Sequence, residues 1–165
     1  MSTKRWAVAA GCALVAAVVL WLTLFRASEE DRINATLRRL VKAVMVKEGD
    51  NVISRTARIK SELREAVDDD VRVDVPDLGI RVTGRQALVE KAAQAGLFFS
   101  SADCELVGSR IQIDESATTA KVDTTAVFTG LRGGERRVDR RDVHLILRKD
   151  GDWRVTTIDV RAAAD

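Results

Sequence analysis

The chain has 165 residues and a formal net charge of +2, with 46% hydrophobic and 32% charged residues. This length fits one ordinary domain with a short extension, and this composition excludes an intrinsically disordered chain. Two Cys residues are too few for a disulfide scaffold. Residues 1–27 contain three basic and no acidic residues, whereas the rest has 24 basic and 25 acidic residues. The domain is therefore close to neutral, which argues against nucleic acid as a partner.

The chain begins with an uncharged stretch, residues 6–25. A helix of 20 residues is about 30 Å long, which matches the hydrocarbon core of a bilayer. Trp6 and Trp21 lie near its two ends, where indole rings favour the headgroup zone. We therefore expect residues 1–27 to form a cytoplasmic tip and one transmembrane helix, with the lipid bilayer as the partner of residues 6–25.

The charges that flank this stretch predict its orientation. Lys4 and Arg5 precede it, and the acidic run 29–31 follows soon after it. Positive residues stay on the cytoplasmic side, so we expect residues 28–165 to form a periplasmic or extracytoplasmic domain anchored in the inner membrane. A cleaved signal peptide is the alternative, and it is disfavoured because Phe25 is too large for the −3 position of a cleavage site before Ser28.

Three stretches of the domain have apolar residues at helical spacing. Ser28 and the acidic residues after it suit the start of a first helix, which we expect to end at Gly49. Asn51 suits the cap of a second helix, and Gly84 opens a third. The three apolar stripes are Ile33, Leu37, Leu40, Val41 and Val44; Val52, Thr56, Ile59 and Leu63; and Leu88, Val89, Ala92, Ala93 and Leu97.

Strands are predicted by runs rich in Val, Ile and Thr that end at turn residues. Gly133-Gly134 and Asp150-Gly151 are typical two-residue hairpin turns. We therefore predict an α+β fold, with three N-terminal helices packed on a curved, mostly antiparallel sheet. The predicted strands are a short pair at 71–75 and 78–82, then 104–113, 117–131, 135–148 and 152–161.

The turns also predict how the strands pair. About Gly133-Gly134, Val122 faces Leu145; about Asp150-Gly151, Val143 faces Ile158. A similar turn at Glu115-Ser116 places Ile111 opposite Ala120 and Val107 opposite Thr124. One face of the sheet then gathers the core: Val107, Ile111, Ile113, Ala120, Val122, Phe128, Val143, Leu145, Leu147, Ile158 and Val160.

Residues 29–161 resemble the nuclear transport factor 2-like superfamily, which includes SnoaL-like cyclases and ketosteroid isomerases. The resemblance is carried by the order of elements and by the segments 68–71, 84–88 and 150–155. It implies a cone of helices over a bent sheet, with a pocket at the mouth. Some members are isomerases, dehydratases or cyclases, many only bind ligands or partner proteins, and several bacterial members with an N-terminal membrane helix serve as assembly parts.

His144 is the only His of the chain. The predicted register places it between Asp123 and Thr157, with Asp142 opposite Asp159. A His–carboxylate pair can transfer protons or contribute to a metal site, so His144 and Asp123 are the catalytic candidates. Both fall on the sheet face opposite the core, where we favour a solvated or interface contact. The chain has no Tyr, which argues against the tyrosine-dependent chemistry of ketosteroid isomerases.

Two further sets of residues suggest binding. Polar residues on the core face could orient a ligand in an apolar pocket, or their hydroxyls could bond to the backbone. On the opposite face, Leu106 and four further apolar residues predict a dimer or partner interface. The ligand candidates are Glu105, Ser109, Thr124 and Thr156, and the four interface candidates are Val127, Ile146, Trp153 and Val155.

The hairpin at residues 131–141 contains five Arg residues. Such a cluster could bind phosphates or anionic headgroups, but interspersed acidic residues favour a solvated hairpin, and no aromatic residue there supports nucleic-acid stacking. The sequence has no phosphate-binding loop, dinucleotide fingerprint or zinc spacing, so we expect neither a cofactor nor a metal.

Together these features predict a membrane-anchored, non-catalytic binding or assembly module of the cell envelope. We expect it to act as a homodimer or with an envelope protein. The alternative is a small-molecule enzyme of the isomerase, dehydratase or cyclase kind, with its pocket at the mouth of the cone.

Overall fold

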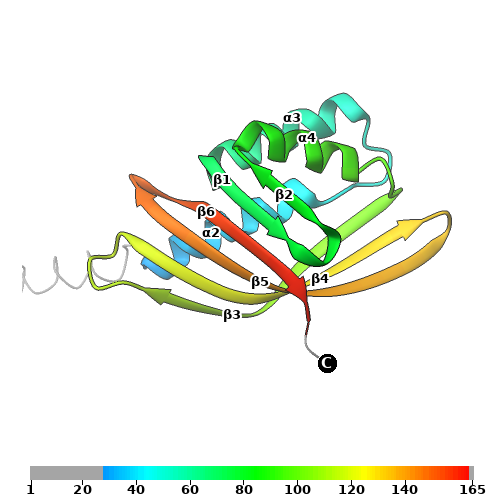
Figure 1. Cartoon of the computed structure of the whole chain (residues 1–165). Helices are drawn as coiled ribbons and strands as arrows, with labels where there is room; N and C mark the ends of the chain where they lie inside the picture. The colour runs from blue at the N-terminus through cyan, green and yellow to red at the C-terminus, as the bar shows by residue number, and fades with distance from the viewer. Residues whose placement is uncertain (1–27, 164–165) are drawn as a thin grey trace, which may run out of the picture.

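The structure, a computed structural model, describes residues 28–163. This part is an α+β domain in which three helices lie on the concave side of a strongly bent sheet (Figure 1). The predicted fold class is confirmed for this domain. The helices are α2 (Glu29–Val44), α3 (Val52–Ala66) and α4 (Arg85–Ala95), and the strands are β1 (Val67–Val75), β2 (Ile80–Thr83), β3 (Ser101–Ile113), β4 (Thr119–Arg132), β5 (Glu135–Asp150) and β6 (Asp152–Ala162).

The predicted membrane segment, residues 6–25, lies outside the described residues. Between residues 28 and 163, no helix is both long enough and apolar enough to cross a bilayer.

The six strands form one sheet in the order β2-β1-β6-β5-β4-β3. All neighbours are antiparallel except β1 and β6, which run parallel. The short pair β1–β2 therefore joins the long meander through the last strand of the chain. This parallel contact makes the sheet mixed.

The helix caps follow the sequence signals. The Ser28 hydroxyl accepts the Asp31 N–H at 3.1 Å while the Asp31 carboxylate accepts the Ser28 N–H, a reciprocal capping box. Asn51 caps α3 by accepting the Ser54 N–H at 2.8 Å. The predicted end of the first helix at Gly49 is wrong.

Helix α2 ends at Val44 because the following backbone pairs with a strand. The N–H and C=O of Val46 exchange hydrogen bonds of 2.8 and 2.9 Å with Ala102 at the start of β3. Gly49 lies in the next turn with a φ of 79°, a conformation that suits glycine.

The predicted register between β4 and β5 is confirmed, since Val122 faces Leu145. The predicted register between β5 and β6 is wrong. Leu147 faces Val155, the next pair is Ile146 with Thr157, and Leu145 faces Ile158. Thr156 is therefore the extra residue of a β-bulge, and its hydroxyl donates to the Ile146 carbonyl at 3.1 Å.

The predicted register between β3 and β4 is also wrong, for two reasons. The loop between these strands covers residues 114–118, so Ile111 faces Val122 rather than Ala120. A second irregularity lies between Val107 and Arg110, and it places Val107 opposite Thr125. Gly108 has a φ of 67° at this point, as expected for a bulge glycine.

Each bulge reverses which side chains of its strand face the core. Trp153 and Val155, predicted to lie at an interface on the outer face, are core residues with 1% and 0% exposure. Leu106 packs against the core, whereas Val107 is 47% exposed. One extra residue inverts the alternation of every side chain on one side of a bulge, which is why these predictions are wrong.

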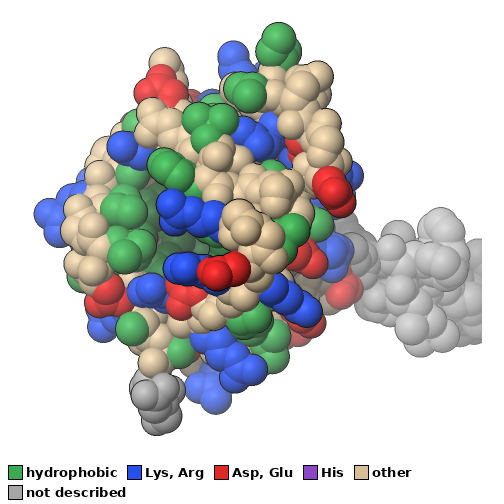
Figure 2. Space-filling view, turned by 90° about the vertical axis from the view of Figure 1, so that its right-hand side faces the viewer, with side chains coloured by type: hydrophobic (Ala, Val, Ile, Leu, Met, Phe, Trp, Pro, Cys, Tyr) green, Lys and Arg blue, Asp and Glu red, His purple; other side chains and the backbone are tan. Residues whose placement is uncertain are grey.

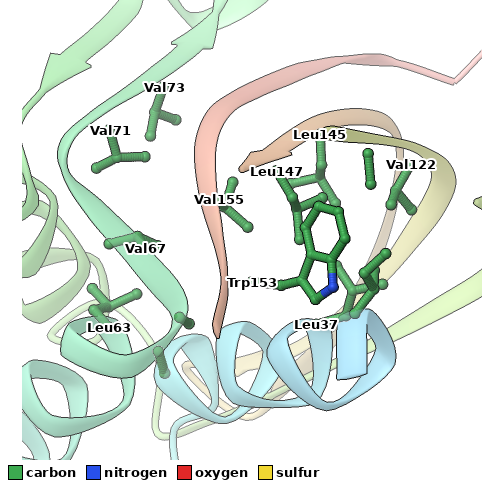
Figure 3. Close-up of a cluster of buried hydrophobic side chains, with 14 of the residues drawn as sticks. Leu37, Leu63, Val67, Val71, Val73, Val122, Leu145, Leu147, Trp153 and Val155 are labelled. Atoms are coloured by element: carbon green, nitrogen blue, oxygen red, sulfur yellow. The ribbon is translucent and has the colours of Figure 1, made fainter. Parts of the chain in front are cut away.

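Trp153 is the largest fully buried side chain of the described residues. It extends from β6 between α2 and the long strands, beside Leu37, Leu145 and Leu147 (Figure 3). The Thr36 hydroxyl donates to the Trp153 carbonyl at 3.0 Å and attaches α2 to this strand. This core supports the wall of the site described next.

Candidate functional site

A cavity of about 180 Å³ lies between the helices and the concave face of the sheet. Its lining comes from all three helices and from β3, β4, β5 and β6, and no charged residue contributes to it. A ligand in this space would be held mainly by apolar contacts. The lining residues are Leu40, Val41, Ala43, Val44, Leu63, Leu88, Ala92, Cys104, Leu106, Ala126, Val143, Leu145, Ile158 and Val160.

The sequence creates this cavity by placing small side chains on facing elements. Ala43 of α2, Ala92 of α4 and Ala126 of β4 each contribute only a methyl group to the wall. The bulge in β3 matters as well, because it turns Leu106 rather than Val107 toward this space. Strict alternation along β3 predicts the opposite, with Val107 on the core face, so this wall could not be predicted without the bulge.

Cys104 supplies the only potentially nucleophilic atom among these lining residues. Burial raises the pKa of its thiol, and the nearby negative charge of Asp103 raises it further. A protonated thiol is a poor nucleophile. Cys104 therefore fits the role of a small apolar side chain rather than that of a reactive group.

A groove of about 380 Å³ adjoins the cavity between α2 and β3. The groove and the cavity share Val41, Cys104 and Leu106, so the two spaces are neighbours along one wall. The remaining groove residues are Asn34, Leu37, Arg38, Lys42, Glu105 and Ser109.

The four predicted ligand residues do not converge on one point. Glu105 and Ser109 line the groove. Thr124 is 6% exposed and donates to the Val107 carbonyl at 3.1 Å, so the Ser109 hydroxyl is the donor in its 3.0 Å contact with Thr124. Thr156 lies apart in the β6 bulge, bonded to the backbone.

His144 lies on the outer face of the sheet, away from the cavity. Its Nδ1 is 2.6 Å from Oδ1 of Asp123, which confirms their predicted cross-strand pairing. Its other neighbour is Asp159 rather than the predicted Thr157, a register shift of two residues. The β5–β6 turn, where Asp150 faces Asp152, contributes one of these residues, and the β6 bulge contributes the other. For the same reason Asp142 faces Arg161 and not Asp159.

The pairing registers place His144 in a row of polar residues that crosses all six strands. A shallow hollow of about 610 Å³ lies over part of this row. Among residues 28–163, no group of three His, Cys, Asp or Glu side chains is arranged to hold a metal ion. In strand order from β2 to β3 the row is Arg81, Asp74, Asp159, His144, Asp123 and Arg110.

The predicted interface face is therefore mainly charged. Val127 and Ile146 alternate with core residues and remain on this face, half-buried. Trp153 and Val155, which were predicted on this face, lie in the core instead. A charged outer face offers less apolar area to a partner than the sequence analysis predicted.

The Arg-rich hairpin joins β4 and β5 at one end of the sheet. Its exposed Arg137 lies 3.5 Å from Glu135, and Arg141 binds Asp139 at 2.9 Å and Asp77 at 3.2 Å. Acidic residues thus engage two of the five Arg side chains. Figure 2 views this end and shows hydrophobic side chains within a recess, with Lys and Arg side chains beside it.

No family model matches the sequence, and no curated protein is similar to it. Solved structures do match the fold. A nuclear transport factor 2-like superfamily protein from Salmonella enterica aligns with a TM-score of 0.67 at 13% identity, covering 84% of this chain and 93% of that one. A candidate scytalone dehydratase from Novosphingobium aromaticivorans aligns with a TM-score of 0.64 at 17% identity, covering 82% and 85%.

A candidate aromatic ring hydroxylase from Novosphingobium aromaticivorans aligns with a TM-score of 0.65 at 15% identity, covering 85% of this chain and 94% of that one. At such identities the likeness concerns the fold alone. The described domain has the nuclear transport factor 2-like fold.

Proposed function

We propose that this domain binds a small, largely apolar molecule in the cavity between its helices and its sheet. The observation that carries the proposal is the apolar wall of a cavity of about 180 Å³. An apolar protein cavity of about 150 Å³ can bind benzene, so one ring or a short chain is the expected size. The proposal is supported by the enzyme names of two compared structures, since both names refer to small-molecule chemistry.

The test is a titration with toluene, followed by NMR of the methyl groups that line the cavity. Ala126→Leu fills the cavity and is expected to abolish saturable shifts, whereas Ala57→Leu, on the exposed surface of α3, retains them. Equal toluene binding by both variants, or no binding by the wild type, would contradict the proposal.

An enzyme is the second candidate function, favoured by the candidate dehydratase and hydroxylase among the compared structures. None of these structures is described as an assembly part, so the comparisons favour this reading over the assembly module. Dehydration needs one group that removes a proton and another that protonates the leaving hydroxyl. The cavity wall has neither, but Asp77 and Asp139 lie close by, bound to Arg141, which pairs with Ala126 of the wall.

An assay with small hydroxylated aromatic compounds tests the enzyme. If the cavity is the active site, Asp139→Asn lowers turnover at least about a hundredfold, a usual effect of removing a general base, while Asp123→Asn on the outer face has no effect. The reverse pattern would assign turnover to the His144–Asp123 pair instead.

We propose further that residues 6–25 anchor the protein in the inner membrane with residues 28–165 on the extracytoplasmic side. The uncharged stretch and the basic residues before it support this placement. Alkaline phosphatase fused after Asp165 is expected to be active and to stay with membranes after carbonate extraction. Inactive or released fusion protein would contradict it.

A homodimer, or a complex with an envelope protein, is also proposed. Its contact surface would include the charged row on the outer sheet face rather than Trp153 and Val155. Sedimentation at low and high salt tests this, because contacts between charged side chains weaken as salt rises.

A further inference from the structure

The groove beside the cavity carries two positive charges. Arg38 and Lys42 are four residues apart on α2, so their side chains lie on one side of the helix, and both are exposed. Neither takes part in an ion pair or a side-chain hydrogen bond within the described residues. By contrast, two other positively charged side chains are paired with carboxylates: Arg39 binds Glu65 at 3.0 Å, and Arg141 binds Asp77 and Asp139.

The position of the groove connects these charges with the apolar cavity. Val41, Cys104 and Leu106 belong to both spaces. A molecule whose apolar part fills the cavity would pass these three residues to bring its polar end toward Arg38 and Lys42. Glu105 contributes one negative charge to the groove, which leaves a net positive charge there.

We propose that the ligand is a small amphipathic acid, with its apolar part in the cavity and its carboxylate between Arg38 and Lys42. This inference rests on the proposed function and assigns the ligand class of the same site. Charge-assisted hydrogen bonds from guanidinium and ammonium groups are stronger than neutral ones. A cavity of about 180 Å³ holds one ring or a short chain, so the carboxylate belongs to a free small acid rather than to a long-chain lipid.

The experiment compares 3-phenylpropanoate with 3-phenylpropanamide, which has the same ring and length but no charge. The full chain is reconstituted in nanodiscs of zwitterionic lipid, and binding is measured by calorimetry. The wild type is expected to bind the acid about tenfold more tightly than the amide, as charge-assisted hydrogen bonds predict. Arg38→Gln and Lys42→Gln each reduce this preference, and the double variant abolishes it without changing amide binding.

Arg39→Gln is the matched control, since Arg39 is the next residue on the same helix and binds Glu65. It is expected to retain the full preference for the acid. Equal binding of acid and amide by the wild type would overturn the assignment of an anionic ligand and leave the apolar site standing. A preference that persists in the double variant would overturn the roles of Arg38 and Lys42. Binding of neither compound would overturn both proposals.

Discussion

The carboxylate of Glu29 accepts a hydrogen bond of 2.6 Å from the indole Nε1 of Trp153, 124 residues later in the chain. The other carboxylate oxygen accepts a hydrogen bond of 2.8 Å from Nζ of Lys149. The first turn of α2 is therefore attached to the β5–β6 hairpin at the residue that fills the core. Hydrogen bonds from Lys149 and then from Trp153 hold the pKa of Glu29 below its usual value of 4.5.

The Glu29 carboxylate is expected to make stability depend on acid pH. Because its pKa is lower in the folded state, its contribution is present above about pH 4.5 and is lost as the pH falls through the folded value. In urea unfolding of residues 28–165, Glu29→Gln should lower the free energy at pH 7 by about 1 kcal/mol. The variant should then lose less stability than the wild type on acidification. Glu30→Gln, the neighbouring control, should follow the wild type.

The burial of Trp153 predicts a large loss of stability on truncation. Trp153→Ala removes a core side chain with 1% exposure and should cost about 3–5 kcal/mol. Ile146→Ala, on the outer face of the sheet, should cost clearly less. Urea unfolding of residues 28–165 measures both changes. An equally small effect of the two substitutions would contradict the placement of Trp153 in the core.

Asp114 organises the loop between β3 and β4. It accepts the N–H groups of Thr118 and Thr119 at 2.9 and 2.8 Å, and it also accepts the Ser116 hydroxyl. The Ser116 hydroxyl, followed by the Thr119 N–H, lowers the pKa of Asp114 to about 2.

The low pKa of Asp114 predicts that this loop stays ordered in moderately acid solution. Its stabilising effect is present above the usual value of 3.8 and is lost as the pH falls toward 2. Asp114→Asn should therefore speed amide hydrogen exchange at Thr118 and Thr119 at pH 5, relative to Glu115→Gln in the same loop. Unchanged exchange in Asp114→Asn would contradict this role of the carboxylate.

Gly130 of β4 allows the ring of Phe99, in the segment between α4 and β3, to pack closely against the strand. A Cβ added there would lie 2.6 Å from Phe99, which stacks edge-on with Phe128 at a centroid distance of 5.4 Å. Gly130→Ala should therefore destabilise the domain by about 1–3 kcal/mol through overpacking. Adding Phe99→Leu should recover part of this loss in a double-mutant cycle. Strictly additive effects would show that the two sites are independent.

Much of the fold could be predicted because its signals are local. Ser28 and Asn51 marked both helix starts through their capping side chains. The Gly133-Gly134 turn predicted the β4–β5 register, and with it the pairing of Asp123 with His144. A two-residue turn allows only one register, so no knowledge of distant contacts was needed.

The errors about which side chains face the core have a common physical origin. Along a strand, successive side chains point to opposite faces of the sheet. After each extra residue, the side chains that would have pointed to one face point to the other. Gly108 inside an otherwise strand-like segment was a signal for the first bulge. At the second bulge, the signal was the pair Trp153 and Val155, which follows the β5–β6 turn. Two large apolar side chains are better suited to the core than to a charged face.

The cavity and its groove could not be predicted in the same way. Their walls combine residues from Asn34 on α2 to Val160 on β6, and their volumes depend on how three helices rest on the bent sheet. The strand pattern predicted Glu105 and Ser109 as ligand residues, but no sequence signal pointed to Arg38 and Lys42. Unpaired cations on an amphipathic helix are common, and only the adjoining cavity distinguishes these two.

The parallel contact between β1 and β6 determines when the domain can be completed during synthesis. β1 and β2 meet the meander only through β6, the last strand to leave the ribosome, and Trp153 arrives with that strand. Until then, α2 and α3 lack the side chains that β6 packs against them. A chain truncated before residue 152 therefore lacks both the strand that joins β1 and β2 to the meander and the largest buried side chain of the core.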